Sequence, residues 1–116
     1  RACAAEMIRI DAVWMATAPL DMRAGLDSVL MRVVQVFGAA QPHHAYVFAN
    51  RRCNRIKVLV HDGLGIWLSA RRLNQGHFIW TRTIEPTTQI NSSQLSALVM
   101  GLPWQKIGHA SIISVL

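Results

Sequence analysis

Two apolar runs joined by an Asp-Gly turn constrain the fold of this chain more than any other feature of its sequence. Residues 54–61, NRIKVLVH, alternate between apolar and polar side chains, and residues 65–73, GIWLSARRL, form a second candidate strand. An Asp-Gly pair between two such runs is a strong hairpin signal, because the turn needs positive φ and glycine adopts it at little cost. We therefore predict an antiparallel hairpin. The residues that shape its turn are Asp62, Gly63 and Gly65.

Other segments extend this hairpin into a small sheet. Residues 11–17 are short and apolar, and residues 44–50 are rich in aromatic and β-branched side chains, as strands are. An Asn-Gln-Gly sequence can then turn the chain into a further strand at 77–80. Residues 81–93 are polar and interrupted by proline, which indicates a loop that contains at most a short edge strand. We expect an antiparallel meander of three or four strands between residues 44 and 80.

Two helices complete the predicted fold. After Asp21, apolar residues recur at i, i+3, i+4 and i+7, which predicts an amphipathic helix with Asp21 as its N-cap and Gly38 as its end. A second helix is expected to begin at Ser92 or Ser93 and to end at Gly101. The predicted class is α+β, a small antiparallel β-meander sheet with two helices packed on one side. The expected core residues are Leu26, Val29, Leu30, Val33, Phe37, Val58 and Leu68.

Length and composition bound the class of protein. The 116 residues fit one domain, which we place at residues 7–116, and residues 1–6 are interpreted as a leader extension or a cloning remnant. Hydrophobic residues make up 52% of the chain and charged residues 16%, which argues against intrinsic disorder. No apolar run approaches the roughly 18 residues of a membrane span. Because two isolated cysteines fit a reducing compartment, we expect a cytoplasmic protein that does not engage the membrane.

Positive charge is concentrated on the hairpin. The chain has 12 Lys and Arg against 6 Asp and Glu, a formal net charge of +6, which favours a polyanionic partner. Six of the 12 cations lie between residues 51 and 72. The expected register puts Arg55, Lys57 and Arg72 on one face of the hairpin, with Arg71 on the other. Each face is then apolar near the turn and basic at the opposite end, so the cations converge at one end of the sheet.

This arrangement predicts a phosphate-binding surface. The planar guanidinium group grips phosphate oxygens through two parallel hydrogen bonds, which a lysine ammonium cannot do. The candidate nucleic-acid-binding residues are Arg51, Arg52, Arg55, Lys57, Arg71 and Arg72. Arg23 could add a contact, because a helix N-terminus already favours negative charge. The nearby aromatic residues Trp67 and Trp80 could stack on unpaired bases, although a role in the core is the simpler interpretation of both.

The residues offer little support for catalysis. Metal-assisted phosphoryl transfer needs several carboxylates around paired metal ions, and the six acidic residues are dispersed along the chain. Neither a glycine-rich phosphate loop nor a nucleophile elbow is recognisable. We therefore predict a protein that is not an enzyme and has neither a metal site nor a cofactor.

Three segments, APLDMRAGLDSVL, YVFANRRCNRIKVLVHDGLGIWLSARRL and LSALVMGLPW, occur in an order and spacing that resembles a known family. The chain from Met7 onward is similar to the small TnpB accessory proteins of the insertion-sequence-sixty-six transposable elements, which are distinct from the RNA-guided nuclease of the same name. After Trp80 the sequence departs from the family pattern, which affects only the path of that loop. The residues that match are Asp21, Met22, Arg23, Gly25, Arg51, Arg52, Arg55, Lys57, Asp62, Gly63, Gly65, Trp67, Leu68, Arg71, Arg72, Leu73 and Gly76.

The resemblance implies a role in transposition beside a separate transposase that carries the catalytic carboxylates. Two mechanisms stay open at this point. In the first, the basic hairpin binds DNA, with the element ends as the expected target. In the alternative, the protein is an adaptor that docks on the transposase or another element-encoded protein without contacting DNA. An exposed edge strand and the apolar tail at 109–116 also make a homo-oligomer a hypothesis.

Overall fold

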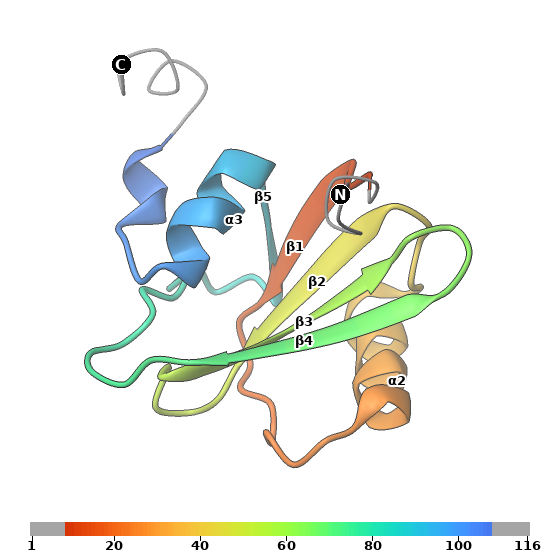
Figure 1. Cartoon of the computed structure of the whole chain (residues 1–116), viewed down its shortest axis with the longest axis horizontal. Coiled ribbons are helices and arrows are strands. Elements are labelled where there is room, and N and C mark those ends of the chain that lie inside the picture. Colours follow the sequence, from red (N-terminus) through yellow and green to blue (C-terminus); the bar gives the residue numbers. More distant parts are fainter. Residues whose placement is uncertain (1–8, 108–116) are drawn as a thin grey trace, which may run out of the picture.

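The computed structural model describes residues 9–107 and places them in one five-stranded sheet flanked by two helices (Figure 1). The predictions for residues 1–6 and for the tail at 109–116 lie outside the described residues. In chain order the elements are β1 (Ala12–Ala16), α2 (Leu26–Phe37), β2 (His44–Ala49), β3 (Arg55–His61), β4 (Ile66–Arg72), β5 (Thr87–Ile90), α3 (Ser92–Val99) and the 3-10 helix η1 (Trp104–Lys106). The predicted α+β class is confirmed.

The predicted antiparallel meander is confirmed as β2-β3-β4, and β1 and β5 extend it into a larger, mostly antiparallel sheet. Its strand order is β4-β3-β2-β1-β5, and β1 runs parallel to β2 while every other pair is antiparallel. The parallel pair follows from the connection, because α2 lies between the two strands and carries the chain back across the sheet. The expected strand at 77–80 does not form; Phe78 there donates its backbone N–H to the Cys53 carbonyl at 2.6 Å. The short edge strand expected within 81–93 is β5.

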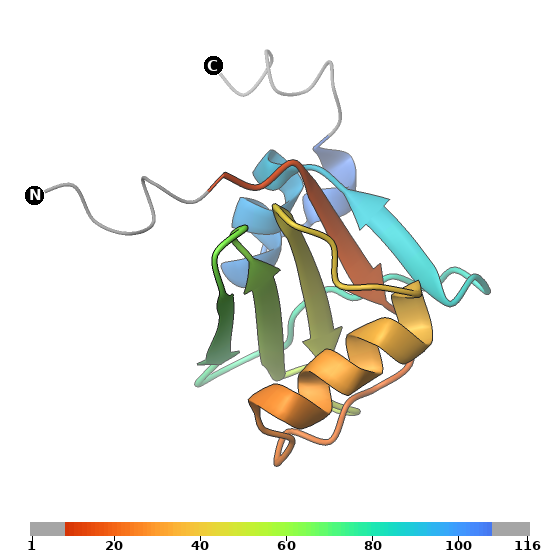
Figure 2. The same ribbon diagram turned by 90° about the vertical axis from the view of Figure 1, so that its right-hand side faces the viewer.

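The two helices pack against opposite faces of the sheet, not on one side as predicted (Figure 2). Side chains of α2 bury Tyr46, Phe48 and Leu59, whereas α3 covers the face that carries Met15 and Val47. The reason lies in the central strands, where neighbouring residues on both faces are apolar. Residues 45–49 of β2 are all buried, so each face of the sheet requires its own cover.

The helix ends differ in part from the predicted ones. Gly25, not Asp21, is the N-cap of α2, and Asp21 instead accepts a hydrogen bond from the Arg23 backbone N–H at 2.9 Å. The helix stops at Gly38 as predicted, with φ of 91°. Asn91 rather than a serine caps α3, through a capping box with Gln94. Within residues 9–107, no helix has the length and apolarity needed to cross a membrane.

Candidate nucleic-acid interface

The loop between β2 and β3 is a closed turn built by two asparagines. Asn50 Oδ1 accepts the backbone N–H groups of Asn54 and Arg55 at 3.1 and 3.0 Å, and Asn50 Nδ2 donates to Asn54 Oδ1 at 2.7 Å. The Cys53 N–H also donates to the Asn50 carbonyl at 3.0 Å. These bonds hold the backbone on both sides of the loop, so the exposed Arg51 and Arg52 project from a fixed support.

Cys53 ties the same loop to the rest of the molecule. Its backbone adopts φ of 57°, a left-handed conformation that is uncommon for a residue with a side chain, and its carbonyl accepts from Phe78 N–H. Burial raises the pKa of the Cys53 thiol. The half-buried side chain packs as a small apolar group against the core on the α3 face of the sheet.

The register of β3 and β4 brings further cations to the same end of the sheet. Arg55 lies opposite Arg72, Lys57 opposite Ala70 and Ile56 opposite Arg71, which is the register expected from the sequence. Arg55 and Arg72 thus form a cross-strand pair of like charges, an arrangement that destabilises a sheet unless an anion lies close by. In the residues that the structure describes, the ion pairs are Arg9–Asp11 and Arg23–Asp21, so neither member of this pair has an acidic partner there.

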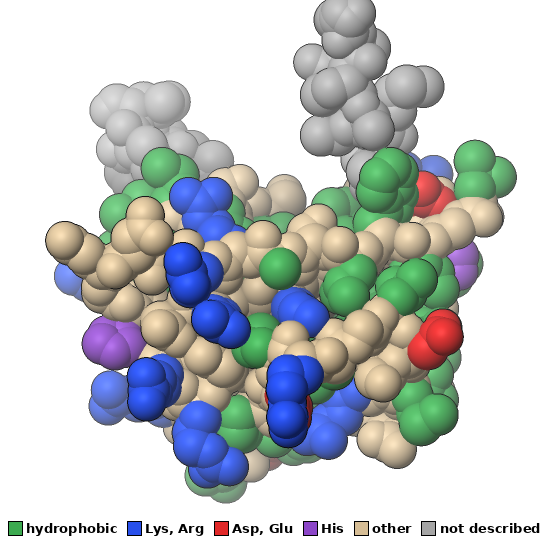
Figure 3. All heavy atoms as spheres, turned by 60° about the horizontal axis from the view of Figure 1, so that its bottom comes forward, with side chains coloured by type: hydrophobic (Ala, Val, Ile, Leu, Met, Phe, Trp, Pro, Cys, Tyr) green, Lys and Arg blue, Asp and Glu red, His purple; other side chains and the backbone are tan. Residues whose placement is uncertain are grey.

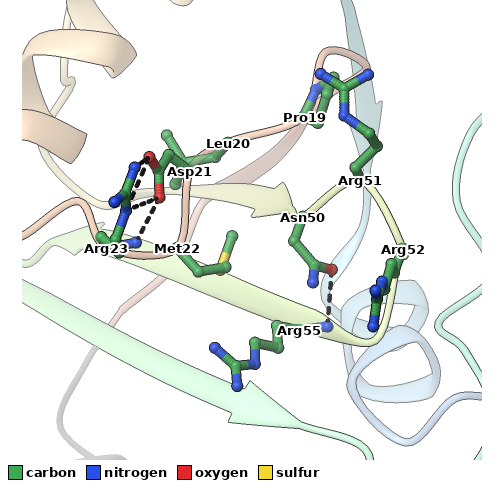
Figure 4. A pocket seen from close by; sticks show the side chains of 9 residues that line it. All are labelled: Pro19, Leu20, Asp21, Met22, Arg23, Asn50, Arg51, Arg52 and Arg55. Carbon is green, nitrogen blue, oxygen red and sulfur yellow. Dashed lines mark hydrogen bonds and ion pairs between the residues drawn. The ribbon is translucent and has the colours of Figure 1, made fainter.

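The seven candidate cations line two adjoining hollows in the surface. The first, of about 470 Å³, lies between the chain before α2 and the β2–β3 loop (Figure 4). The second, of about 310 Å³, lies over the basic ends of β3 and β4 and shares Met22 and Arg55 with the first. Lys and Arg side chains gather on this side of the molecule, where little acidic surface is visible (Figure 3). We call the lining cations the basic surface: Arg23, Arg51, Arg52, Arg55, Lys57, Arg71 and Arg72.

The seven cations are not equivalent. Arg23 forms an ion pair with Asp21 at 2.8 Å, and hydrogen bonds from Arg23 lower the pKa of Asp21 to about 2. Lys57 Nζ donates to the Ala24 carbonyl at 2.6 Å, which fastens the segment before α2 to the sheet. Both groups therefore have partners within the fold. The cations that remain exposed, with no acidic partner among residues 9–107, are Arg51, Arg52, Arg55, Arg71 and Arg72.

At the other end of β3, hydrogen bonds to the Asp62 carboxylate hold the turn to β4. Its Oδ1 accepts from the Leu64 and Gly65 N–H groups at 2.8 and 2.7 Å, and its Oδ2 accepts from Trp67 Nε1 at 2.6 Å. The Trp67 hydrogen bond, followed by the two backbone bonds, lowers the pKa of Asp62. Gly63 has φ of 91°, and a Cβ there would lie 3.1 Å from the His43 ring. This turn lies at the far end of the hairpin from the basic surface.

The sequence predicts the cations of the basic surface but not the residues that support them. The asparagines that close the arginine loop are not among the predicted site residues, although an Asn on each side of the RRC tripeptide is a turn signal. The bond from Lys57 to Ala24 joins residues 33 apart in sequence and has no local signature. Among residues 9–107, no three His, Cys, Asp or Glu side chains gather as metal ligands.

The fold and the basic surface define a small basic α+β protein, and comparison with known sequences gives its family. The sequence model described as "IS66 Orf2 like protein" matches residues 11–109, so the chain belongs to this family of transposition-associated accessory proteins.

Two relatives from Sinorhizobium fredii (strain NBRC 101917 / NGR234) carry the names "Uncharacterized protein y4hO" and "Uncharacterized protein y4jC". The first is 35% identical over 94 residues, which cover 80% of this chain and 82% of the relative. The second is 30% identical over 97 residues, which cover 82% of each. No solved structure matches the chain.

Proposed function

We propose that this protein is a non-catalytic accessory factor for transposition of a bacterial insertion sequence and that it binds nucleic acid through the basic surface. The observation that carries this proposal is that five exposed arginines of the basic surface have no acidic partner in the described part of the chain. They project from a hydrogen-bonded loop and from paired strands, so little backbone conformational entropy is lost when they bind. DNA in the bacterial cytoplasm is the proposed partner.

The pairing of Arg55 with Arg72 supports a phosphate as the group that is bound. The Leu73 N–H donates to the Asn54 carbonyl, which makes the neighbouring Arg55–Arg72 pair a non-hydrogen-bonded one. Cα atoms in such pairs are about 4.5 Å apart, so the two guanidinium groups can reach one phosphate between them. Binding then replaces repulsion between like charges with two charge-assisted hydrogen-bonding contacts. Arg51 and Arg52, on the adjoining loop, would contact neighbouring phosphates of the nucleic-acid strand.

Binding measured across a salt series tests the proposal. The probes are a duplex that contains the element end and a single-stranded oligonucleotide of the same sequence. Because each phosphate contact on duplex DNA contributes about 0.9 to the slope of log affinity against log salt, Arg51→Ala/Arg52→Ala/Arg55→Ala is expected to reduce that slope by roughly two to three units. The control, Arg9→Ala/Arg82→Ala/Lys106→Ala, removes the same charge outside the basic surface and is expected to keep the slope within about one unit.

Other outcomes would contradict the proposal in distinct ways. Equal loss in the two triple variants would show that net charge, and not the basic surface, causes the binding. No binding at low salt, together with co-purification of the transposase, would support the adaptor alternative. Metal-dependent cleavage that disappears on substitution of Asp21 or Asp62 would show that the protein is a nuclease.

A further inference from the structure

The outer edge of β4 has a row of hydrogen-bonding groups that no other described residue engages. β4 is the terminal strand of the sheet, and its edge faces away from the other strands (Figure 2). The Leu73 N–H donates to the Asn54 carbonyl and the Asp62 N–H to the Gly65 carbonyl, which shows which residue pairs of β3 and β4 are hydrogen-bonded. In this pattern the backbone groups of Trp67, Ser69 and Arg71 bond to β3. The backbone N–H and C=O groups of the alternate residues therefore point outward. These residues are Ile66, Leu68, Ala70 and Arg72.

The charge along β4 is distributed unevenly, with positive charge at one end only. Arg71 and Arg72 lie at one end, residues 68–70 are uncharged, and Trp67 lies at the other end with its indole bonded to the Asp62 carboxylate. A parallel copy of the strand in register would place each arginine beside its own copy, which is repulsive. An antiparallel copy would place the arginines opposite the apolar and acidic end. The charge distribution of β4 is therefore complementary to itself in the antiparallel direction.

We propose that two copies of this protein associate through antiparallel pairing of β4 with β4, centred on Ser69. In this register Ile66 pairs with Arg72 of the second copy and Leu68 pairs with Ala70, so all four outward-facing residues of each edge find hydrogen-bond partners. Trp67 lies opposite Arg71 of the second copy, which places a guanidinium beside an aromatic ring and close to Asp62. Trp67 is 46% exposed, so part of its surface is available for this contact.

The symmetry of this pairing has a geometric consequence. The twofold axis that relates antiparallel strands of a sheet is perpendicular to the sheet, so the same face of each copy lies on the same side. Arg55, Lys57 and Arg72 lie on the α2 face, and the two basic surfaces thus open on one side of a continuous ten-stranded sheet. Six residues of strand separate the two Arg72 positions along the interface, or about 20 Å at the usual rise. The pairing itself does not depend on nucleic-acid binding.

Disulfide cross-linking tests the register. In a Cys3→Ser/Cys53→Ser background, Ser69→Cys places two thiols across the twofold axis in a non-hydrogen-bonded pair, where Cβ atoms lie about 4.5 Å apart, near the geometry of a disulfide. Ala70→Cys is the matched control, because its own copy lies two residues further along the partner strand, about 8 Å away and too far to bridge. Mild oxidation is expected to yield a covalent dimer from Ser69→Cys at least several-fold faster than from Ala70→Cys. Equal rates, or no dimer from either variant, would overturn the proposed register.

Sedimentation over a concentration series tests the interface independently. The unsubstituted protein, free of nucleic acid, is expected to show a reversible monomer–dimer equilibrium. Ala70→Pro removes an outward N–H and leaves the bonds to β3 intact, so it is expected to abolish the dimer while circular dichroism stays unchanged. A protein that remains monomeric at every concentration, or a folded Ala70→Pro variant that still dimerises, would overturn the proposal.

Discussion

The two turns that bound β3 are closed by similar side chains of different charge. At the β2–β3 end, the neutral amide of Asn50 accepts two backbone N–H groups; at the β3–β4 end, the carboxylate of Asp62 accepts two backbone N–H groups and the Trp67 indole. The first turn presents two exposed arginines, and the second presents Leu64, which is 99% exposed. Each turn is held by a short side chain that replaces a backbone partner.

The difference shows how a tight turn can be stabilised without neutralising the charges that it presents. A carboxylate in place of Asn50 would accept the same N–H groups but would place a negative charge among the arginines. At the other end a carboxylate carries no such penalty, because the turn is remote from the basic surface. With an amide at the first turn and a carboxylate at the second, negative charge stays away from the cationic end of the hairpin.

Asn50→Asp is the sharpest test of this comparison. The turn is expected to stay closed, because the new carboxylate accepts the same backbone bonds and the Asn54 amide can rotate to donate to it. Affinity for the duplex is expected to fall by about tenfold to a hundredfold, with about one unit lost from the salt slope, since the added charge pairs with the neighbouring arginines. Asp62→Asn is the matched control and is expected to leave affinity within about twofold. Equal effects of the two substitutions would contradict the comparison.

Gly63→Ala breaks the opposite turn. A side chain at φ of 91° is strained, and the new Cβ would contact the His43 ring at 3.1 Å. The free energy of unfolding is expected to fall by about 1–2 kcal/mol in a denaturant titration, whereas the salt slope of DNA binding in the remaining folded protein stays the same. Gly65→Ala, in the same turn at a position with open space around a Cβ and no positive φ, is the control for the loss of a glycine. A change in the salt slope would show that the two ends of the hairpin are coupled.

Asp21→Asn tests a carboxylate that already lies at the basic surface. The substitution removes the ion pair with Arg23 at 2.8 Å and leaves that guanidinium available for a phosphate. Affinity for the duplex is expected to rise by about threefold, a modest change because both groups are exposed. Asp27→Asn removes the same charge from α2 outside the two hollows and is expected to have a smaller effect. Weaker binding by Asp21→Asn would indicate that the ion pair positions Arg23 for its ligand.

Acid titration gives the smallest expected effect. Hydrogen bonds from Trp67 and from two backbone N–H groups lower the pKa of Asp62 below its ordinary value of 3.8. A lowered carboxyl pKa stabilises the folded state at pH values above the ordinary one, and this stabilisation is lost as the pH falls through the lowered value. The fluorescence difference between the unsubstituted protein and Trp67→Phe is therefore expected to change at a midpoint below pH 3.8. A midpoint at or above this value would contradict the hydrogen-bonding scheme.

Local sequence predicted those parts of the fold that depend on short-range geometry. The Asp-Gly turn and the alternation on both sides of it determine the β3–β4 register, and Gly38 ends α2 because its φ of 91° suits glycine. Asp21 was wrong as a helix cap because its carboxylate is engaged by Arg23 two residues later. The parallel β1–β2 pair and the placement of helices on both faces arise from long-range packing, which periodicity within one segment does not encode.

The candidate site shows the same division. The convergence of Arg55, Arg71 and Arg72 follows from the hairpin register and was therefore predictable. The approach of the 19–23 segment to the arginine loop was not, because it depends on where α2 packs and on the bond from Lys57 to Ala24. Sequence thus predicted which charges lie on the hairpin, whereas the three-dimensional fold determines which of them have internal partners.

The position of β1 in the sheet also affects the order in which the protein can fold during its synthesis. β1 is the first strand of residues 9–107, yet it lies between β2 and β5, and Val13 pairs with Ile90. Its second edge stays open until nearly all of the described chain has been synthesised. Because such distant pairings form slowly, a nascent chain that has not yet released β5 exposes β1 to chaperones and to neighbouring nascent chains. The five-stranded sheet therefore becomes complete only once residues 87–90 have been released from the ribosome.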